Sequence, residues 1–319
     1  MNKPESHATS TLARLQQFVV LSILVGAGLW GFRWWPDNPV KAVLGSATIV
    51  LLHVLVLALQ FGLMVWVNRR DPAPPIRPCA WLRAWWDEVR VATLVFGWRQ
   101  PFRWRLAPDT DVAAAPAFTA AVFVHGFVCN RGMWLPWMRV LRERGIPYTS
   151  VNLEPVFGSI DDYVPLIDDA VRRAHALTGR PPALVCHSMG GLAARAWLAV
   201  TPNAAARVSC VITIGTPHHG TWLASLSHTP NGRQMRVDGE WLQRLRALEA
   251  NQSRPPFVCW YSNGDNIVFP ASTAILEGAD NRHLDAVPHV AMAYHPTVMV
   301  TSLAMLASAD SSPFARTAS

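Results

Sequence analysis

The chain has 319 residues, of which 51% are hydrophobic and 15% charged, and its formal net charge is +7 at pH 7. This composition excludes a disordered or fibrous protein, because such chains lack the apolar residues that build a core. Most of the positive excess lies in residues 1–117, where it flanks long apolar runs. A nucleic-acid-binding domain instead carries a basic face on a folded unit, so the pattern favours a membrane bilayer as the partner and no nucleic acid.

Two long apolar stretches come first along the chain. Residues 43–67 carry no charge, and as a helix they measure about 37 Å against a hydrocarbon core of about 30 Å. They predict a transmembrane span in which His53 and Gln60 are the strongly polar residues. Residues 15–35 predict a second span that ends in two tryptophans. The alternatives are a cleaved signal peptide, although no A-x-A-like site follows the run, and a buried hairpin of a soluble core.

The distribution of arginine predicts the orientation of this hairpin. The connector between the spans contains Arg33 and Lys41, whereas five arginines follow the second span: Arg69, Arg70, Arg77, Arg83 and Arg90. The positive-inside rule then places both termini and the catalytic domain in the cytoplasm, at a bacterial-type inner membrane. The five cysteines are widely spaced and form no CxxC pair, which agrees with a reducing compartment and indicates neither a disulfide framework nor a zinc site.

Residues 71–117 separate this N-terminal membrane anchor, residues 1–70, from the rest of the chain. The prolines of residues 71–78 favour a stiff, extended linker. Beyond them, Trp81 and Trp85 recur at helical spacing beside arginines, which is typical of a helix lying in the membrane interface. The alternative is that these tryptophans pack on the following domain.

From residue 118 the pattern changes to short apolar runs that alternate with amphipathic stretches. This alternation predicts an α/β domain with a parallel sheet and crossover helices. Strands are expected at 118–124, 148–153, 183–186 and 257–261, and helices at 134–144, 160–177 and from 189 onward.

The sequence VCHSMGG places a serine between a predicted strand and a predicted helix. The strand ends just before Ser188 and the helix begins at Met189. This is the context of the G-x-S-x-G nucleophile elbow, in which small neighbours allow a strained turn that exposes the serine. Cys186 replaces the first glycine of that motif, and its side chain is still small. The alternative is a buried structural serine in a chance sequence.

Four motifs carry a resemblance to α/β-hydrolases of the bacterial lipase and esterase type. In chain order they are VFVHGFVCNRGMW, VCHSMGGLAARAWL, VITIGTPHHGT, and SNGDNIVFPAS followed by AVPHVAMAYHP. The resemblance covers about residues 118–308. It implies an α/β-hydrolase fold, a mostly parallel central sheet flanked by helices with a helical cap or lid, and a triad in the order Ser, Asp, His. The elbow also resembles that of membrane-associated inositol deacylases.

The expected triad consists of Ser188, Asp265 and His289. A hydroxyl is a poor nucleophile at neutral pH, so Ser188 needs a base, and the histidine of the resembling family's last loop matches His289. Asp265 lies in the turn-forming sequence NGDN and would orient that base. The alternative base is His295, whereas His283 lies too early, before the expected strand end. Asp280 and Asp285, interpreted as solvated loop charges, are the alternatives for the carboxylate.

The oxyanion of the tetrahedral intermediate needs preorganised donors. The resemblance assigns this role to the backbone N–H groups of Phe127 and Met189. His125 is expected to be structural and to tie the loop down. His218 and His219 have no carboxylate or cysteine at ligand spacing, so we expect loop hydrogen bonds and no metal site there.

No cofactor is expected either. The family's calcium-dependent lipases carry a carboxylate shortly after the catalytic histidine, and here the following residues are Val290, Ala291 and Met292. Residues 220–254 form an insertion with tryptophans and leucines at helical spacing, which predicts a cap or lid, with an ordinary packed helix pair as the alternative. Residues 309–319 are expected to be a disordered tail.

These features predict a membrane-anchored serine hydrolase that cleaves carboxylic esters of lipid-like substrates. The same machinery would serve a phospholipid or lysophospholipid deacylase, or an acyl-thioesterase, and sequence does not separate them. A non-catalytic membrane adaptor on a hydrolase scaffold is the alternative from another class. Two spans lack the repeats and paired intramembrane charges of a transporter.

Overall fold

The computed structural model describes residues 10–111 and 118–307, so the predicted disordered tail lies outside the described residues. Its centre is a sheet of six strands in the order β2-β1-β3-β4-β5-β6, and every neighbouring pair is parallel. The strands are β1 (Ala121–Val124), β2 (Tyr148–Ser150), β3 (Ala183–His187), β4 (Cys210–Ile214), β5 (Phe257–Ser262) and β6 (Asp280–Leu284). This confirms the predicted α/β-hydrolase fold with its parallel sheet.

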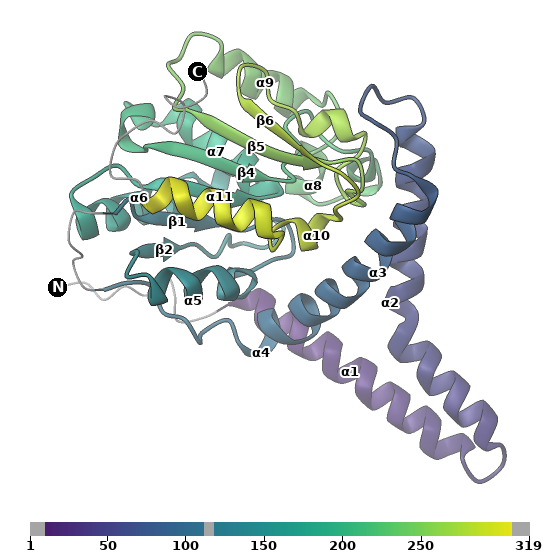
Figure 1. Cartoon of the computed structure of the whole chain (residues 1–319). Helices are drawn as coiled ribbons and strands as arrows, with labels where there is room; N and C mark the ends of the chain where they lie inside the picture. The colour runs from purple at the N-terminus through teal and green to yellow at the C-terminus, as the bar shows by residue number, and fades with distance from the viewer. Residues whose placement is uncertain (1–9, 112–117, 308–319) are drawn as a thin grey trace.

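Helices cover both faces of the sheet (Figure 1). They are α5 (Leu135–Glu143), α6 (Val164–Thr178), α7 (Met189–Val200), α10 (His289–Met292) and α11 (Pro296–Ala307). Alternate residues of one strand enter different hydrophobic clusters: Val122 packs with α6 and α7, whereas Phe123 packs with α5 and α11. Such alternation is what a strand buried on both faces requires.

Two expected strands are shorter than the sequence indicated. β1 begins at Ala121, because the amide of Thr119 bonds instead to the carbonyl of Leu306 in α11. β2 ends at Ser150, and the amide of Leu153 bonds to the ring of His125. In both places the sequence pattern extends beyond the residues that pair with a neighbouring strand.

An N-terminal helical hairpin projects from this domain, as Figure 1 shows. Its helices are α1 (Thr11–Trp34) and α2 (Pro39–Asn68). Small residues lie where they cross: the hydroxyl of Ser46 donates to the carbonyl of Ala27 at 2.8 Å, and a Cβ at Gly45 would overlap the ring of Trp30. Close approach through small residues is typical of helix pairs in membranes.

By length and composition, both hairpin helices are long and apolar enough to cross a membrane. Most of their large side chains beyond the domain are exposed, and residues 18–34 measure about 25 Å as a helix, close to the thickness of a hydrocarbon core. A third such stretch, His289–Ala307, forms α10 and α11 and is 39% buried against the sheet domain. The hairpin is therefore the exposed apolar unit.

Helix α3 (Pro78–Leu94) crosses from α2 toward the start of α1 (Figure 1) and continues through a π-helical turn (Val95–Arg99) into α4 (Gln100–Phe102). One face of α3 packs inward with Trp81 and Trp85, while Leu82 and Trp86 on another face are exposed. The packing of Trp81 and Trp85 agrees with the alternative that these tryptophans pack inward, and a position of the outer face in the membrane interface stays a prediction. His53 of α2 bonds to Thr93 of α3 at 3.0 Å, which gives one polar residue of the second span its partner.

The proline-rich residues 71–78 lie along the domain surface and bond to it. Asp71 accepts hydrogen bonds from the amide and the hydroxyl of Ser272, and the carbonyl of Pro74 accepts one from Asn263 at 3.0 Å. Arg77 pairs with Asp285 at 3.1 Å. The segment is bent at residues 72 and 73, and it is attached to the domain through Asp71, Pro74 and Arg77.

The insertion at residues 220–254 contains a 3₁₀ helix (Trp222–Leu226), α8 (Pro230–Gln234) and α9 (Glu240–Glu249). In α9, Trp241, Leu242 and Leu245 are buried in the core cluster beside α7. The ring of Trp222 lies 6.2 Å from that of Trp66 in α2, edge to face. The insertion therefore packs on the domain core at one end and meets the hairpin at the other.

Candidate active site

Ser188 occupies a strained turn between β3 and α7. Its backbone angles are φ 53° and ψ −128°, a region that residues other than glycine rarely adopt. The turn is held by its amide, which donates to the carbonyl of Ile214 at 2.9 Å, and by Thr216, whose hydroxyl donates to the Ser188 carbonyl at 2.8 Å. A Cβ at Gly190 would lie 2.5 Å from a carbonyl oxygen of β1, so the small residue is required there.

The cysteine that departs from the elbow motif lies within β3. Cys186 is fully buried in the hydrophobic cluster beneath α6 and α7, away from water. Burial raises the pKa of its thiol, so it stays protonated. Its side chain fills core volume and leaves the turn at Ser188 intact.

Asp265 and His289 form a buried pair at the same edge of the sheet. Nδ1 of His289 lies 2.9 Å from Oδ2 of Asp265. The other carboxylate oxygen accepts the amides of Ile267 at 2.9 Å and Val268 at 2.8 Å, which fixes the orientation of the carboxylate. The bond assigns the proton to Nδ1 and leaves Nε2 of His289 as the nitrogen that can accept one.

The pair lies beside the elbow. A Cβ on Gly215, which directly follows β4, would be 3.0 Å from the Asp265 carboxylate and 3.1 Å from Nδ1 of His289. The ring of His187, which precedes Ser188, is 4.6 Å from the ring of His289, and its Nε2 donates to the His289 carbonyl at 3.2 Å. The structure therefore brings the three expected triad residues to one edge of the sheet, where Ser188 follows β3, Asp265 follows β5 and His289 follows β6.

The electrostatics suit a general base. Burial alone would lower the pKa of His289, but the charge and hydrogen bond of Asp265, with a smaller contribution from Glu88, outweigh it and raise the pKa above its usual value. Burial also lowers the pKa of His187 well below its usual value, so this neighbour stays neutral.

The alternative residues are placed elsewhere. Burial lowers the pKa of His295, and the ring of His283 packs on Tyr261 with centroids 5.2 Å apart. Asp280 pairs with Arg282 at 2.6 Å, and Asp285 bonds to Arg77 and Asn263, so neither is a simply solvated charge. Within residues 10–111 and 118–307, His289 is the histidine whose ring bonds a carboxylate.

The expected oxyanion donors lie together. The loop that follows β1 begins with His125 and Gly126 and is called the HG loop here. A Cβ on Gly126 would be 2.7 Å from the Cβ of Ser188, so this loop lies directly against the elbow. In the part of the chain that the structure describes, neither the Phe127 nor the Met189 amide has a hydrogen-bond acceptor. Two free N–H groups beside the serine are what a developing oxyanion needs.

His125 ties the HG loop down. Its Nδ1 donates to the carbonyl of Gly126 at 2.9 Å, and its Nε2 accepts the amide of Leu153 at 3.0 Å. Burial lowers its pKa to about 4, so the ring is neutral. The paired histidines also make loop bonds: Nε2 of His218 bonds to Thr213, and Nδ1 of His219 accepts from Arg246. Among the described residues no group of three or more potential metal ligands occurs.

Two residues near His289 were not expected at the site from the sequence. Glu88 of α3 accepts hydrogen bonds from the amides of Val290 and Ala291, and Gln60 of α2 accepts one from Asn266. Glu88 follows Trp81 and Trp85 by seven and three residues, so it shares their inward face. A carboxylate on an apolar helical face is a signal that could have identified it.

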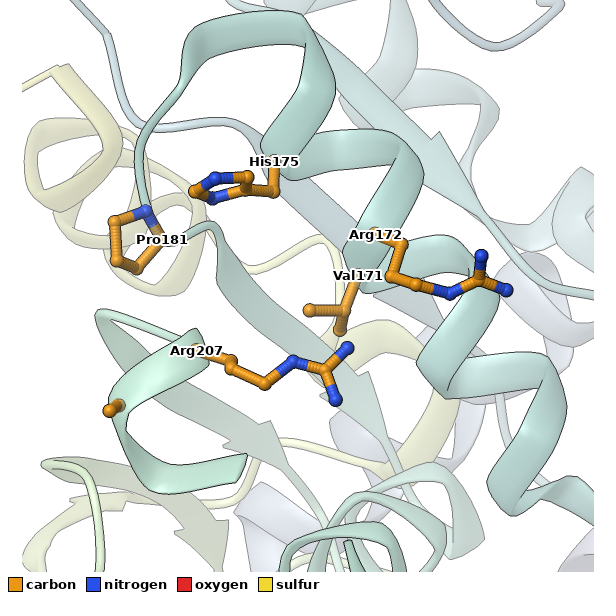
Figure 2. A pocket seen from close by; sticks show the side chains of 6 residues that line it. Val171, Arg172, His175, Pro181 and Arg207 are labelled. Carbon is orange, nitrogen blue, oxygen red and sulfur yellow. The ribbon is translucent and has the colours of Figure 1, made fainter. Parts of the chain in front are cut away.

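A cavity of about 260 Å³ lies apart from this site. Figure 2 shows its lining, which consists of Val171, Arg172, His175, Pro181, Ala206 and Arg207. Pro181 precedes β3, whereas Ser188 follows it, so the cavity is at the amino ends of the strands. Its two arginines already pair with Asp168. The cavity is therefore separate from the candidate active site.

A profile of the alpha/beta hydrolase family matches residues 121–316. Among solved structures, the chain is similar to the mature form of lipase BlEst2 of Bacillus licheniformis, with 20% identity, a TM-score of 0.55, and coverage of 62% of this chain and 96% of that chain. It is also similar to lipase B of Aspergillus fumigatus, with 18% identity, a TM-score of 0.56, and coverage of 93% and 82%. At these identities the likeness concerns the fold. A search of curated proteins found no match.

Proposed function

The chain belongs to the alpha/beta hydrolase family, and we propose that it is a membrane-anchored serine hydrolase that cleaves carboxylic ester bonds of lipid-like substrates. The observation that carries this proposal is the buried Asp265–His289 pair, 2.9 Å apart, beside the strained turn at Ser188. A nucleophile, a base and an orienting carboxylate on three strand ends are the parts that acyl transfer requires.

In the proposed mechanism, Oγ of Ser188 attacks the ester carbonyl while Nε2 of His289 takes its proton. Asp265 stabilises the resulting imidazolium, and the amides of Phe127 and Met189 bind the oxyanion. The intermediate collapses, and the leaving alcohol takes the proton from His289. Water then gives a proton to His289 and attacks the acyl-enzyme. Collapse returns that proton to Ser188 and releases the carboxylic acid.

The membrane part of the proposal rests on the α1–α2 hairpin. Its exposed apolar surface is favourable in a bilayer and unfavourable in water, and its length suits one crossing by each helix. We propose the anchor at residues 1–70, the connecting segment at 71–117, and the hydrolase domain at 118–308 with a cap at about 220–254. An active site held near the surface would meet lipid esters at high effective concentration.

The arginines after the second span support a cytoplasmic domain. A fluorescent reporter that matures only in the cytoplasm, fused after residue 110, should be bright, and alkaline phosphatase fused there should be inactive. The opposite pair of results would place the domain on the other side of the membrane.

Labelling with a fluorophosphonate tests the catalytic part. The full-length chain in detergent should be labelled on Ser188 and should hydrolyse a short-chain ester. Ser188→Ala should lose both, whereas the matched control Ser253→Ala, at an exposed position, should keep both. Full labelling and turnover in a folded Ser188→Ala variant would refute the proposed nucleophile.

A further inference from the structure

Glu88 is a buried carboxylate that reaches the active site from outside the sheet domain. It lies on α3, and 1% of its surface is exposed. Its oxygens accept hydrogen bonds from the amide of Val290, at 2.9 and 3.2 Å, and from the amide of Ala291, at 3.1 Å. These residues directly follow His289. A carboxylate is costly to bury without hydrogen-bond donors, and these amides supply them. The bonds therefore join α3 firmly to the backbone that follows His289.

The amide of His289 is connected to the hairpin in turn. It donates to Oδ1 of Asn266 at 3.3 Å, and Nδ2 of Asn266 donates to Oε1 of Gln60 in α2 at 3.0 Å. Three successive amides, at residues 289–291, therefore bond to side chains that belong to, or are bonded to, the N-terminal helices. A displacement of this backbone would move the His289 ring relative to Asp265.

The charge of Glu88 also acts on the base. The titratable groups facing it are His289, Asp265 and Tyr294, with Arg99 stacked over the tyrosine ring at 5.2 Å. Burial raises the pKa of Glu88 to about 7, although the two amides and His289 favour its charged form. Burial would lower the pKa of His289, while Asp265 and Glu88 raise it. Removing the charge at Glu88 should therefore lower the pKa of His289.

We propose that Glu88 is a positioning residue for the catalytic base. It fixes the backbone of residues 289–291 and so lets α3, the helix that follows the membrane hairpin, hold His289 in line with Asp265. Leu82 and Trp86 on the outer face of this helix are exposed, so one helix presents apolar groups outward and supports the base inward. The catalytic consequence rests on the proposed function; the effect on the imidazole does not.

The test uses the full-length chain in detergent micelles. It measures kcat and KM for a soluble short-chain ester across pH, the titration of ¹⁵N-labelled His289 by NMR, and Tm. The variants are Glu88→Gln, which keeps the shape and removes the charge, and Glu88→Asp, which keeps the charge on a shorter stem. Asp87→Asn is the matched control, because the neighbouring carboxylate is partly exposed and pairs only with Arg90 among the described residues.

Glu88→Gln should lower kcat by about tenfold or more, since small misplacements of a catalytic group have effects of up to about 100-fold, with KM within about twofold. The base must be neutral, so activity falls as pH drops through its pKa, and a lowered pKa moves this acid limb to lower pH. Glu88→Asp should lower kcat with the acid limb near that of the wild type. Asp87→Asn should match the wild type in every measurement.

The inference is overturned by a Glu88→Gln variant with wild-type kcat and an unmoved His289 titration. It is also overturned by a lower Tm and kcat with an unmoved titration, because that pattern is purely structural. If Glu88→Gln does not fold, the kcat of Glu88→Asp decides: a lowered kcat supports the inference, and a wild-type kcat overturns it. If the wild type hydrolyses no ester, the proposed function fails, and the shift in the His289 titration still supports or overturns the role of Glu88.

Discussion

The two ends of the α1–α2 hairpin differ in chemistry although they belong to the same helices. The outer part presents large apolar side chains to its surroundings. The base of the hairpin carries amides instead: Gln16 donates to the carbonyl of Val128 in the HG loop at 3.4 Å, and Gln60 accepts from Asn266, the residue after Asp265. Exposed apolar surface suits a bilayer, whereas buried polar bonds specify position. In the proposed function the outer part serves as the membrane anchor, and the base of the hairpin holds two loops of the candidate active site.

Removing the proposed catalytic base should have the largest effect on either kind of substrate. His289→Ala should lower kcat/KM by about 10³-fold or more, because the nucleophile loses its proton acceptor. His295→Ala is the matched control and should keep substantial turnover, since this ring bonds no carboxylate among the described residues. Steady-state hydrolysis of a soluble ester measures both. The reverse ranking would transfer the role of base to His295.

Charges in the middle of the outer hairpin should separate anchoring from chemistry. Leu51→Lys combined with Leu55→Lys puts two cations at bilayer depth, at a cost of about 3 kcal/mol each. Turnover of a vesicle-embedded ester should fall by about tenfold or more, while turnover of a soluble ester in detergent stays within about twofold. Val40→Lys, beside Lys41 at the tip of the hairpin, is the control and should change neither. Equal losses on both substrates would show that the outer part also supports the site.

A change at the base of the hairpin should give the opposite signature and a smaller effect. Gln60→Leu keeps the volume but removes the acceptor of Asn266, so kcat should fall a few-fold on soluble and embedded esters alike. Gln17→Leu makes the same chemical change at a residue that bonds only to the carbonyl of Pro101 among the described residues, and it should be neutral. A Gln60→Leu effect confined to vesicles would contradict this division. Deleting residues 1–78 removes the outer part and the base of the hairpin together, so this deletion does not distinguish their effects.

The parts of the molecule that depend on local pattern could be predicted from the sequence. Strands β1, β2, β3 and β5 follow from apolar periodicity, and the elbow follows from small residues around Ser188. The polar β6 carries no such pattern, and its Asp280 was interpreted as a loop charge. The long uncharged runs indicated both hairpin helices within a few residues of their ends. Each of these features can be recognised within about 30 consecutive residues, without knowing which distant segments are in contact in the fold.

The contacts between the N-terminal region and the active site could not be predicted in the same way. Glu88 and Val290 are 202 residues apart in sequence, and Gln60 and Asn266 are 206 apart. The sequence showed Gln60 as a polar interruption of a span, but its partner depends on how the hairpin seats on the domain. Likewise, the prolines of residues 71–78 predicted an extended segment and gave no sign of its bonds to Ser272 and Asn263.

Trapping the acyl-enzyme tests the central claim most directly. The full-length chain, mixed with a short-chain ester and quenched in acid within the first turnover, should carry one acyl group on the peptide that contains Ser188. The mass increase should disappear in Ser188→Ala and remain in Ser253→Ala. An acyl group on another residue, or ester hydrolysis at the wild-type rate by folded Ser188→Ala, would contradict the account.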